Sequence, residues 1–81
     1  MSLEDDVIDL IAEQLGLDKA EVTPDSVIID DLGADSLDLT ELTMALESHF
    51  NCPIPDSESA KLRTVQNVIN FIAQRKASSG N

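Results

Sequence analysis

The sequence predicts an all-α fold, a small irregular four-helix bundle with a long loop between its first two helices and a short third helix. Three observations carry this prediction. Apolar residues recur at helical spacing in separate segments, prolines and glycines interrupt the chain between them, and no segment alternates in the way a β-strand does. With 81 residues, 42% of them hydrophobic, the chain makes one small domain whose core must be mostly aliphatic.

The first predicted helix covers residues 3–15. Ser2 and Asp5 have the spacing of a capping box at its start, and Gly16 suits its end. Its apolar stripe consists of Leu3, Val7, Leu10, Ile11 and Leu15.

The connection over residues 16–35 is long for a segment without regular structure. We expect six apolar residues to pin it to the core, and we expect such a loop to let the first two helices run in a similar direction. These residues are Leu17, Val22, Val27, Ile28, Ile29 and Leu32.

The second helix begins at Ser36 with Asp35 as its N-cap and ends before Pro53, because proline cannot continue a helix. Its predicted inner stripe is Leu39, Leu42, Thr43, Leu46 and Phe50.

The sequence predicts two further helices. Asp56 is expected to cap a third helix that reaches about residue 62, and Thr64 to cap a fourth. The inner stripe of the fourth helix is Val65, Val68, Ile69 and Ile72. Residues 77–81 are predicted to form a flexible tail, which leaves residues 1–76 as the domain.

The net charge of the chain narrows the classes of partner that it can bind. Sixteen acidic and five basic residues give a net charge of -11. This charge disfavours binding to nucleic acid and anionic membranes and favours basic protein partners. Cys52 is alone, so no disulfide forms within the chain. No apolar run reaches membrane-spanning length and the N-terminus lacks a signal-peptide pattern, so we expect a cytoplasmic protein. We also expect it to be a monomer.

The stretch "DLGADSLDLTEL" places Ser36 at a helix start among carboxylates. One interpretation makes Ser36 a simple capping residue. A hydrolase triad would need His49, which lies several turns away along the same helix, so we reject it. In the third interpretation Ser36 is a modification site, because a helix N-terminus favours a phosphoryl group there.

The stretch resembles the acyl carrier proteins. "GADSLD" at residues 33–38 looks like their attachment motif, whose serine carries 4′-phosphopantetheine, and the similarity continues through "IPD" at 54–56 and "TVQNVINFI" at 64–72. Glycine followed by alanine before the Asp-Ser pair is most similar to the free-standing fatty-acid-synthesis type, because peptidyl carriers more often have paired glycines.

The resemblance implies a non-enzymatic carrier. Ser36, flanked by Asp35 and Leu37, would hold the phosphopantetheine that comes from coenzyme A, and fatty acyl groups would travel as thioesters on its thiol. The implied partners are a phosphopantetheinyl transferase, the separate enzymes of fatty acid synthesis and acyltransferases. A carrier of another pathway (polyketide, lipid A or lipoyl precursor) and an unmodified acidic adaptor or inhibitor are the alternatives.

The outer side of the second helix is the predicted docking surface, where acids would steer basic partners and two apolar side chains would anchor them. The docking surface comprises Asp35, Leu37, Asp38, Glu41, Met44 and Glu47.

The resemblance also implies that the acyl chain folds back between the helices. The inner stripes supply the candidate lining, and we expect the Thr43 hydroxyl to bond back to the Leu39 carbonyl. The predicted acyl pocket consists of Ile28, Leu39, Thr43, Leu46, Ile54, Leu62, Val68 and Phe71.

No specific metal site is predicted. Asp30, Asp31, Asp35 and Asp38 lack the spacing of an EF-hand, so a divalent cation would bind there only weakly. His49 and Cys52 are too few to hold zinc; we expect His49 at the surface and Cys52 to be inert.

Overall fold

The computed structural model describes the backbone of residues 2–79 and the side chains of residues 2–75. Over this range the chain is all-helical, as predicted, and its only extended pairing is an isolated bridge between Val27 and Thr64. The elements in chain order are α1 (Leu3–Leu15), the 3₁₀ helix η1 (Lys19–Glu21), α2 (Ser36–Phe50), α3 (Asp56–Ser59) and α4 (Val65–Ser79).

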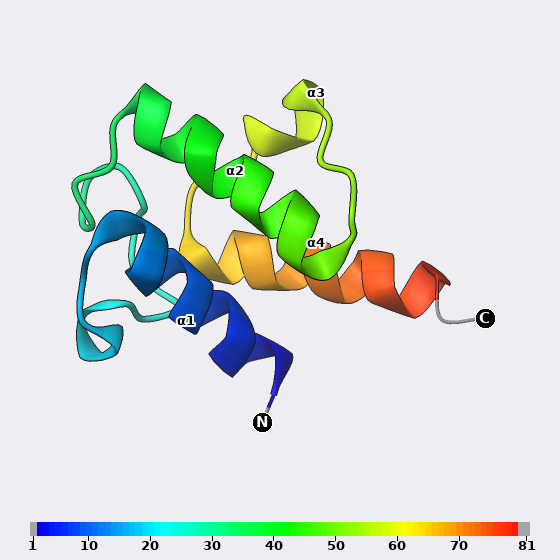
Figure 1. Cartoon of the computed structure of the whole chain (residues 1–81), viewed down its shortest axis with the longest axis horizontal. Helices are drawn as coiled ribbons and strands as arrows, with labels where there is room; N and C mark the ends of the chain where they lie inside the picture. The colour runs from blue at the N-terminus through cyan, green and yellow to red at the C-terminus, as the bar shows by residue number, and fades with distance from the viewer. Residues whose placement is uncertain (1, 80–81) are drawn as a thin grey trace.

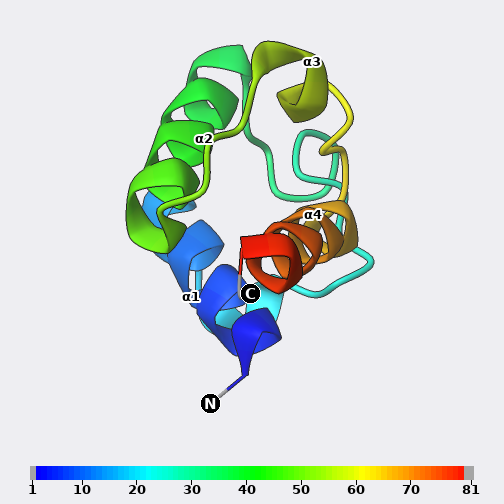
Figure 2. The same ribbon diagram turned by 90° about the vertical axis from the view of Figure 1, so that its right-hand side faces the viewer.

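The helices α1, α2 and α4 form the bundle, and α1 packs against both of the others (Figures 1 and 2). Figure 1 shows α1 running opposite to α2 and α4, so the expectation that α1 and α2 share a direction is wrong. The long loop folds back on itself instead of spanning the bundle, and α2 therefore begins near the end at which α1 stops.

Backbone hydrogen bonds explain the path of this loop. The N–H groups of Ile28, Val65 and Gln66 donate to the carbonyls of Arg63 (2.9 Å), Ser26 (3.1 Å) and Pro24 (2.9 Å), respectively. The loop is therefore tied to the start of α4. Four of its six apolar residues contribute to the core: Leu17, Val22, Ile28 and Leu32. Val27 is half-buried outside the core cluster, and Ile29 is 52% exposed, which contradicts its predicted pinning role.

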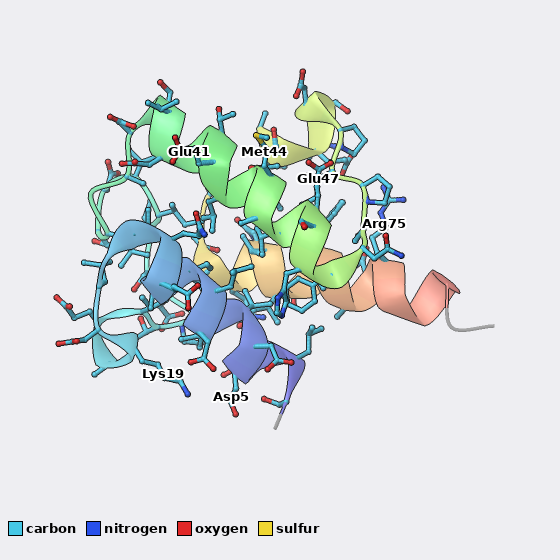
Figure 3. The ribbon with its side chains drawn as sticks, viewed as in Figure 1. Asp5, Lys19, Glu41, Met44, Glu47 and Arg75 are labelled. Atoms are coloured by element: carbon cyan, nitrogen blue, oxygen red, sulfur yellow. The ribbon has the colours of Figure 1, made fainter. Side chains whose placement is uncertain are left out.

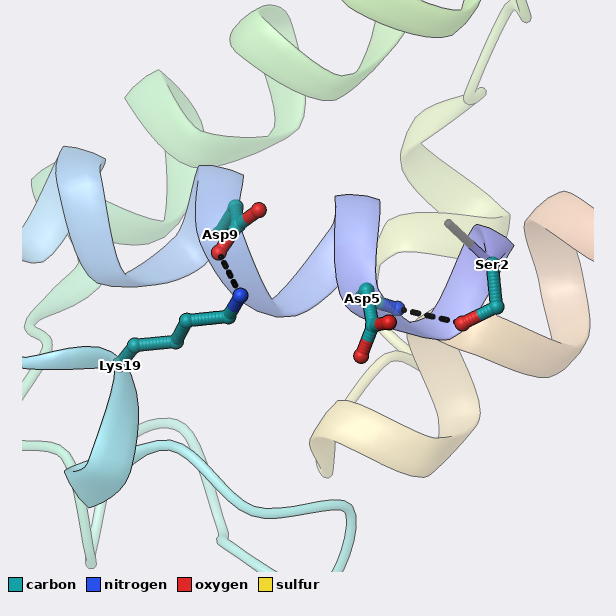
Figure 4. Close-up of polar contacts among 4 residues, drawn as sticks. All are labelled: Ser2, Asp5, Asp9 and Lys19. Carbon is teal, nitrogen blue, oxygen red and sulfur yellow. Dashed lines mark hydrogen bonds and ion pairs between the residues drawn. The ribbon is translucent and has the colours of Figure 1, made fainter.

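The ends of α1 and α2 lie where the sequence places them. Ser2 Oγ accepts from the Asp5 N–H at 3.2 Å (Figure 4), and Gly16 ends α1 in the left-handed conformation with φ of 69°. Asp35 is the N-cap of α2, and this helix ends at Phe50. Local capping chemistry is sufficient to predict both helices.

The short third helix departs from the prediction. It covers Asp56–Ser59 and its N-cap is Pro55, so Asp56 is the first helical residue and the cap assigned to it is wrong. The Pro55 carbonyl accepts from both Glu58 N and Ser59 N, and the chain then turns away so that Leu62 is buried.

The fourth helix is capped by Thr64, as predicted, because its Oγ1 accepts from the Asn67 N–H at 3.1 Å. The helix continues to Ser79 and so includes residues 77–79 of the predicted tail, whereas residues 80–81 lie outside the described residues. The division of the chain at residue 76 stays a prediction. Among the described residues, no helix combines the length and hydrophobicity needed to cross a membrane.

The core is aliphatic, as the composition predicts. The stripes of α1, α2 and α4 converge in it, together with Ile28 from the loop. The largest fully buried side chains are Val7, Ile11, Ile28, Leu42, Leu46, Val65, Val68 and Ile72.

An ion pair that the sequence pattern does not reveal joins η1 to α1. Lys19 Nζ lies 3.0 Å from Asp9 Oδ1 (Figure 4). The hydrogen bond to Asp9, helped by the charge of that carboxylate, raises the pKa of Lys19 above its usual value. Both side chains are more than half exposed, so solvent screens the pair and it adds little to stability.

Candidate functional site

Ser36 is the first residue of α2, and its side chain is exposed. A reciprocal capping box surrounds it: Asp35 Oδ1 accepts from the Asp38 N–H at 2.8 Å, and Asp38 Oδ2 accepts from the Asp35 N–H at 3.3 Å. The two carboxylates thereby fix the first turn of the helix from both sides. Ser36 is therefore an exposed residue at a well-capped helix start.

The backbone immediately before Ser36 is also held in place. Ala34 is 4% exposed and its N–H donates to the Ile28 carbonyl at 3.2 Å, so its side chain is an anchor in the core. Gly33 has φ of 74°, and a Cβ there would meet no heavy atom within 4 Å. The glycine is therefore required by its backbone conformation, and it leaves open space beside the serine.

His49 lies at the far end of the same helix from Ser36. It is exposed, and its ring packs edge-on against Phe50 with centroids 4.7 Å apart. It also lines a 190 Å³ hollow whose other residues all come from α1: Asp6, Asp9, Leu10 and Glu13. A helix separates the serine from the imidazole, which agrees with rejecting a hydrolase triad.

Several carboxylates near Ser36 bind backbone groups. Besides Asp35 and Asp38, Asp31 accepts from the Val27 N–H through Oδ2 at 2.7 Å. Within the described part of the chain, no three His, Cys, Asp or Glu side chains converge as metal ligands would. The structure thus lends no support to a weak cation site formed by Asp30, Asp31, Asp35 and Asp38. Cys52 is free and buried, which suits an inert residue.

Most residues of the predicted docking surface are exposed, and Figure 3 shows two of them, Glu41 and Met44, along α2. Leu37 and Met44 are 64% and 61% exposed, values that are unusual for large apolar side chains, and Glu41 is exposed beside them. Ile29, from the preceding loop, is a third exposed apolar residue that the sequence reasoning missed. Because it lies in an apolar run, the sequence pattern predicts a core residue.

Glu47 differs from Asp35 and Asp38 of the docking surface in its reach, because those two carboxylates bind backbone groups only within the first turn of α2. Glu47 is half-buried, and its Oε2 accepts from the Ile54 N–H at 2.8 Å. Part of this carboxylate is thus engaged with its own chain.

Two hollows lie between α2 and the α3 region. The larger, 310 Å³, is lined by Leu39 and Leu62 of the predicted acyl pocket together with Val27, Ile29, Asp30, Ser59, Ala60 and Arg63. The smaller, 150 Å³, is lined by Leu39, Thr43 and Ile54 together with Thr40, Met44, Glu47, Asp56 and Ser59.

The predicted acyl pocket is thus brought together in part. Ile28, Leu46, Val68 and Phe71 line neither of these two hollows, and the first three are fully buried core residues. Thr43 Oγ1 donates to the Leu39 carbonyl at 2.8 Å, as predicted. Helical periodicity predicts the lining residues on α2. It does not predict Ile29, Ala60 and Arg63, which come from loops without periodicity.

Comparisons with known proteins agree with this arrangement. The family model described as "Phosphopantetheine attachment site" matches residues 5–72. An acyl carrier protein of Syntrophobacter fumaroxidans is 49% identical over 72 residues, which cover 89% of each chain. One from Solidesulfovibrio magneticus is 50% identical over 76 residues, or 94% of this chain and 97% of the relative. One from Chlamydia caviae is 55% identical over 76 residues, or 94% and 99%.

Proposed function

The chain belongs to the acyl carrier proteins, and from that premise we propose that it carries growing fatty acyl chains on a 4′-phosphopantetheine arm attached to Ser36. The arm supplies a terminal thiol that holds an acyl group as a thioester. The protein thus shuttles acyl groups between the separate enzymes of fatty acid synthesis. We propose no catalysis by the chain itself.

The observation that carries the choice of Ser36 is its exposure at the start of a fixed, 15-residue helix. The positive end of the helix dipole favours a phosphodiester at this position, and the open space beside Gly33 admits it. Asp35 and Asp38 would repel the phosphate, yet each accepts a backbone N–H within the capping box. Their contribution is to hold the serine, together with Leu37, in a defined position for the modifying enzyme.

Partners are proposed to approach along the exposed part of α2. A carrier of this family requires a phosphopantetheinyl transferase and enzymes that act on the acyl group. Basic patches on the transferase, the synthesis enzymes and acyltransferases would meet Glu41 and its acidic neighbours, while Leu37 and Met44 would anchor the contact. We further propose a cytoplasmic location for this monomer, which suits a chain whose single cysteine cannot form an internal disulfide.

Intact-mass measurement tests the proposal. The unmodified protein is incubated with coenzyme A, Mg²⁺ and a phosphopantetheinyl transferase. It should gain the mass of one phosphopantetheine, and Ser36→Ala should gain none while unfolding at the same temperature as the wild type. Ser48→Ala is the matched control, since Ser48 is an exposed serine on the same helix. Loading of Ser36→Ala would contradict the assignment.

Extension of the acyl group distinguishes this proposal from a carrier of another pathway. The loaded protein should accept successive two-carbon extensions from a fatty acid synthase system of separate enzymes. If it loads normally but supports no extension, the carrier belongs to a different pathway, such as polyketide, lipid A or lipoyl precursor supply. If it never loads, the adaptor alternative gains instead.

A further inference from the structure

The linker over residues 51–55 joins α2 to α3, and one residue satisfies all of its backbone donors. Pro53 and Pro55 have no N–H. The N–H groups of Asn51 and Cys52 donate to the backbone carbonyl of Glu47, the second at 3.1 Å. The Ile54 N–H donates to the Glu47 side chain at 2.8 Å. The hydrogen bonds of the linker's N–H groups therefore all go to Glu47, two of them to its backbone carbonyl and one to its carboxylate.

This attachment has consequences for the core and for the smaller hollow. The linker contributes two buried side chains, Cys52 (6% exposed) and Ile54 (5% exposed). Glu47 and Ile54 both line the 150 Å³ hollow between α2 and α3, in which Thr43 supplies another part of the wall. The bond between them fixes how far the linker stands from α2 at this hollow.

The chemistry of the bond makes it a strong fastening. A hydrogen bond to an ionised carboxylate is stronger than one between neutral groups, and losing it leaves the Ile54 N–H without this acceptor in a partly buried place. Figure 3 shows Glu47 where α2 passes the α3 region. Glu41, two turns earlier on the helix, is exposed, as a docking acid should be.

We propose that Glu47 is a positioning residue: its carboxylate holds the linker against α2 and so keeps the hollow between α2 and α3 closed around an apolar acyl chain. This inference rests on the proposed carrier function for its cargo, but the fastening itself belongs to the unmodified fold. Contacts with basic partners fall to the exposed acids, of which Glu41 is the clearest.

Amide exchange of Ile54, followed by NMR in the unmodified protein, tests the fastening. Glu47→Ala should speed exchange of this N–H by about tenfold or more, since a charged hydrogen bond that holds a local segment is lost. Glu47→Gln keeps an acceptor oxygen and should stay within about threefold of the wild type. Glu41→Ala removes the same charge from an exposed position and should leave exchange unchanged. Equal exchange in Glu47→Ala and the wild type would overturn the proposal.

Cleavage of the acylated protein by hydroxylamine tests the consequence for cargo. Glu47→Ala should expose the thioester and raise the cleavage rate, whereas Glu47→Gln and Glu41→Ala should protect it as the wild type does. If Gln and Ala speed cleavage equally, charge alone is responsible and the positioning role is rejected. The exchange experiment needs no modified protein, so a failure of Ser36 to load would count against the proposed function while Ile54 exchange still decides the role of Glu47.

Discussion

The two ends of α2 use the same chemistry for opposite purposes. At each end a carboxylate accepts a backbone N–H at 2.8 Å. At the first end the bond joins Asp35 to Asp38, three residues apart, and orders only the turn of the helix to which both belong. At the other end Glu47 reaches Ile54, seven residues on and in another segment.

The difference in reach determines what each end exposes. A local cap fixes the helix without covering it, so Ser36 and Leu37 remain at the surface. At the other end the bond holds the linker beside α2, and Leu46 and Ile54 are core residues there. An accessible attachment point thus lies at the start of α2, and docking residues stay exposed as far as Met44, whereas toward the other end the buried Leu46 and Ile54 form a closed apolar interior.

The largest effect should come from truncating the closed end. Leu46→Ala removes a side chain that is 1% exposed, so it should lower the free energy of unfolding by about 2–5 kcal/mol. Leu37→Ala, the same change at a side chain that is 64% exposed, should alter it by at most about 0.5 kcal/mol. Urea unfolding of both variants measures the contrast, and equal losses would refute the division of α2 into an open and a closed end.

The open end was the easier one to predict from sequence. Its determinants are local: Asp35 and Asp38 are three residues apart, so the capping box and the start of the helix follow from spacing alone. The motif around Ser36 also predicts the family. Buried stripes on α1, α2 and α4 were predictable for the same reason, since helical periodicity reports which face is apolar.

The closed end depends on contacts between segments, which periodicity does not contain. The bond from Ile54 to Glu47 joins two elements across a proline-rich linker, and Glu47 therefore looked like one more exposed acid. The predicted burial of Ile29 is wrong for a related reason: three consecutive apolar residues at 27–29 do not reveal which one faces water. The direction of α2 relative to α1 likewise depends on the path of the loop, whose backbone is bonded to Arg63, Val65 and Gln66 at the start of α4.

A change in the cap should have the next largest effect. Asp35→Ala removes the acceptor for the Asp38 N–H and should lower the free energy of unfolding by about 1 kcal/mol. Asp35→Asn retains a side-chain acceptor and should cost clearly less. Urea unfolding distinguishes the two variants. If they unfold alike and below the wild type, the charge at the helix start matters more than the hydrogen bond.

Charge reversal on the docking surface should affect association more than folding. Glu41→Lys should reduce the second-order rate constant of modification by the transferase by about three- to tenfold at low salt, and by less at high salt, because screening weakens steering. Glu13→Lys makes the same change at an exposed position on α1 and is the matched control. Equal slowing by both variants would mean that net charge, and not the docking surface on α2, attracts the enzyme.

The smallest effect concerns Thr43, which lies between the two ends and lines the 150 Å³ hollow. Its hydroxyl donates to the Leu39 carbonyl of its own helix at 2.8 Å, so no bond to another element is lost in Thr43→Val. The unacylated protein should change in stability by at most about 0.5 kcal/mol. With a medium-length acyl chain attached, the added methyl replaces a polar group beside apolar cargo, so the rise in melting temperature on acylation should be preserved or increased. Ser48→Ala is the control, because it also removes a hydroxyl from α2, at an exposed position that does not line this hollow. Melting of the acylated and unacylated forms of each variant decides the matter: a smaller gain in Thr43→Val than in the wild type would place the chain elsewhere, whereas equal increases in both variants would trace the effect to the helix and not to the hollow.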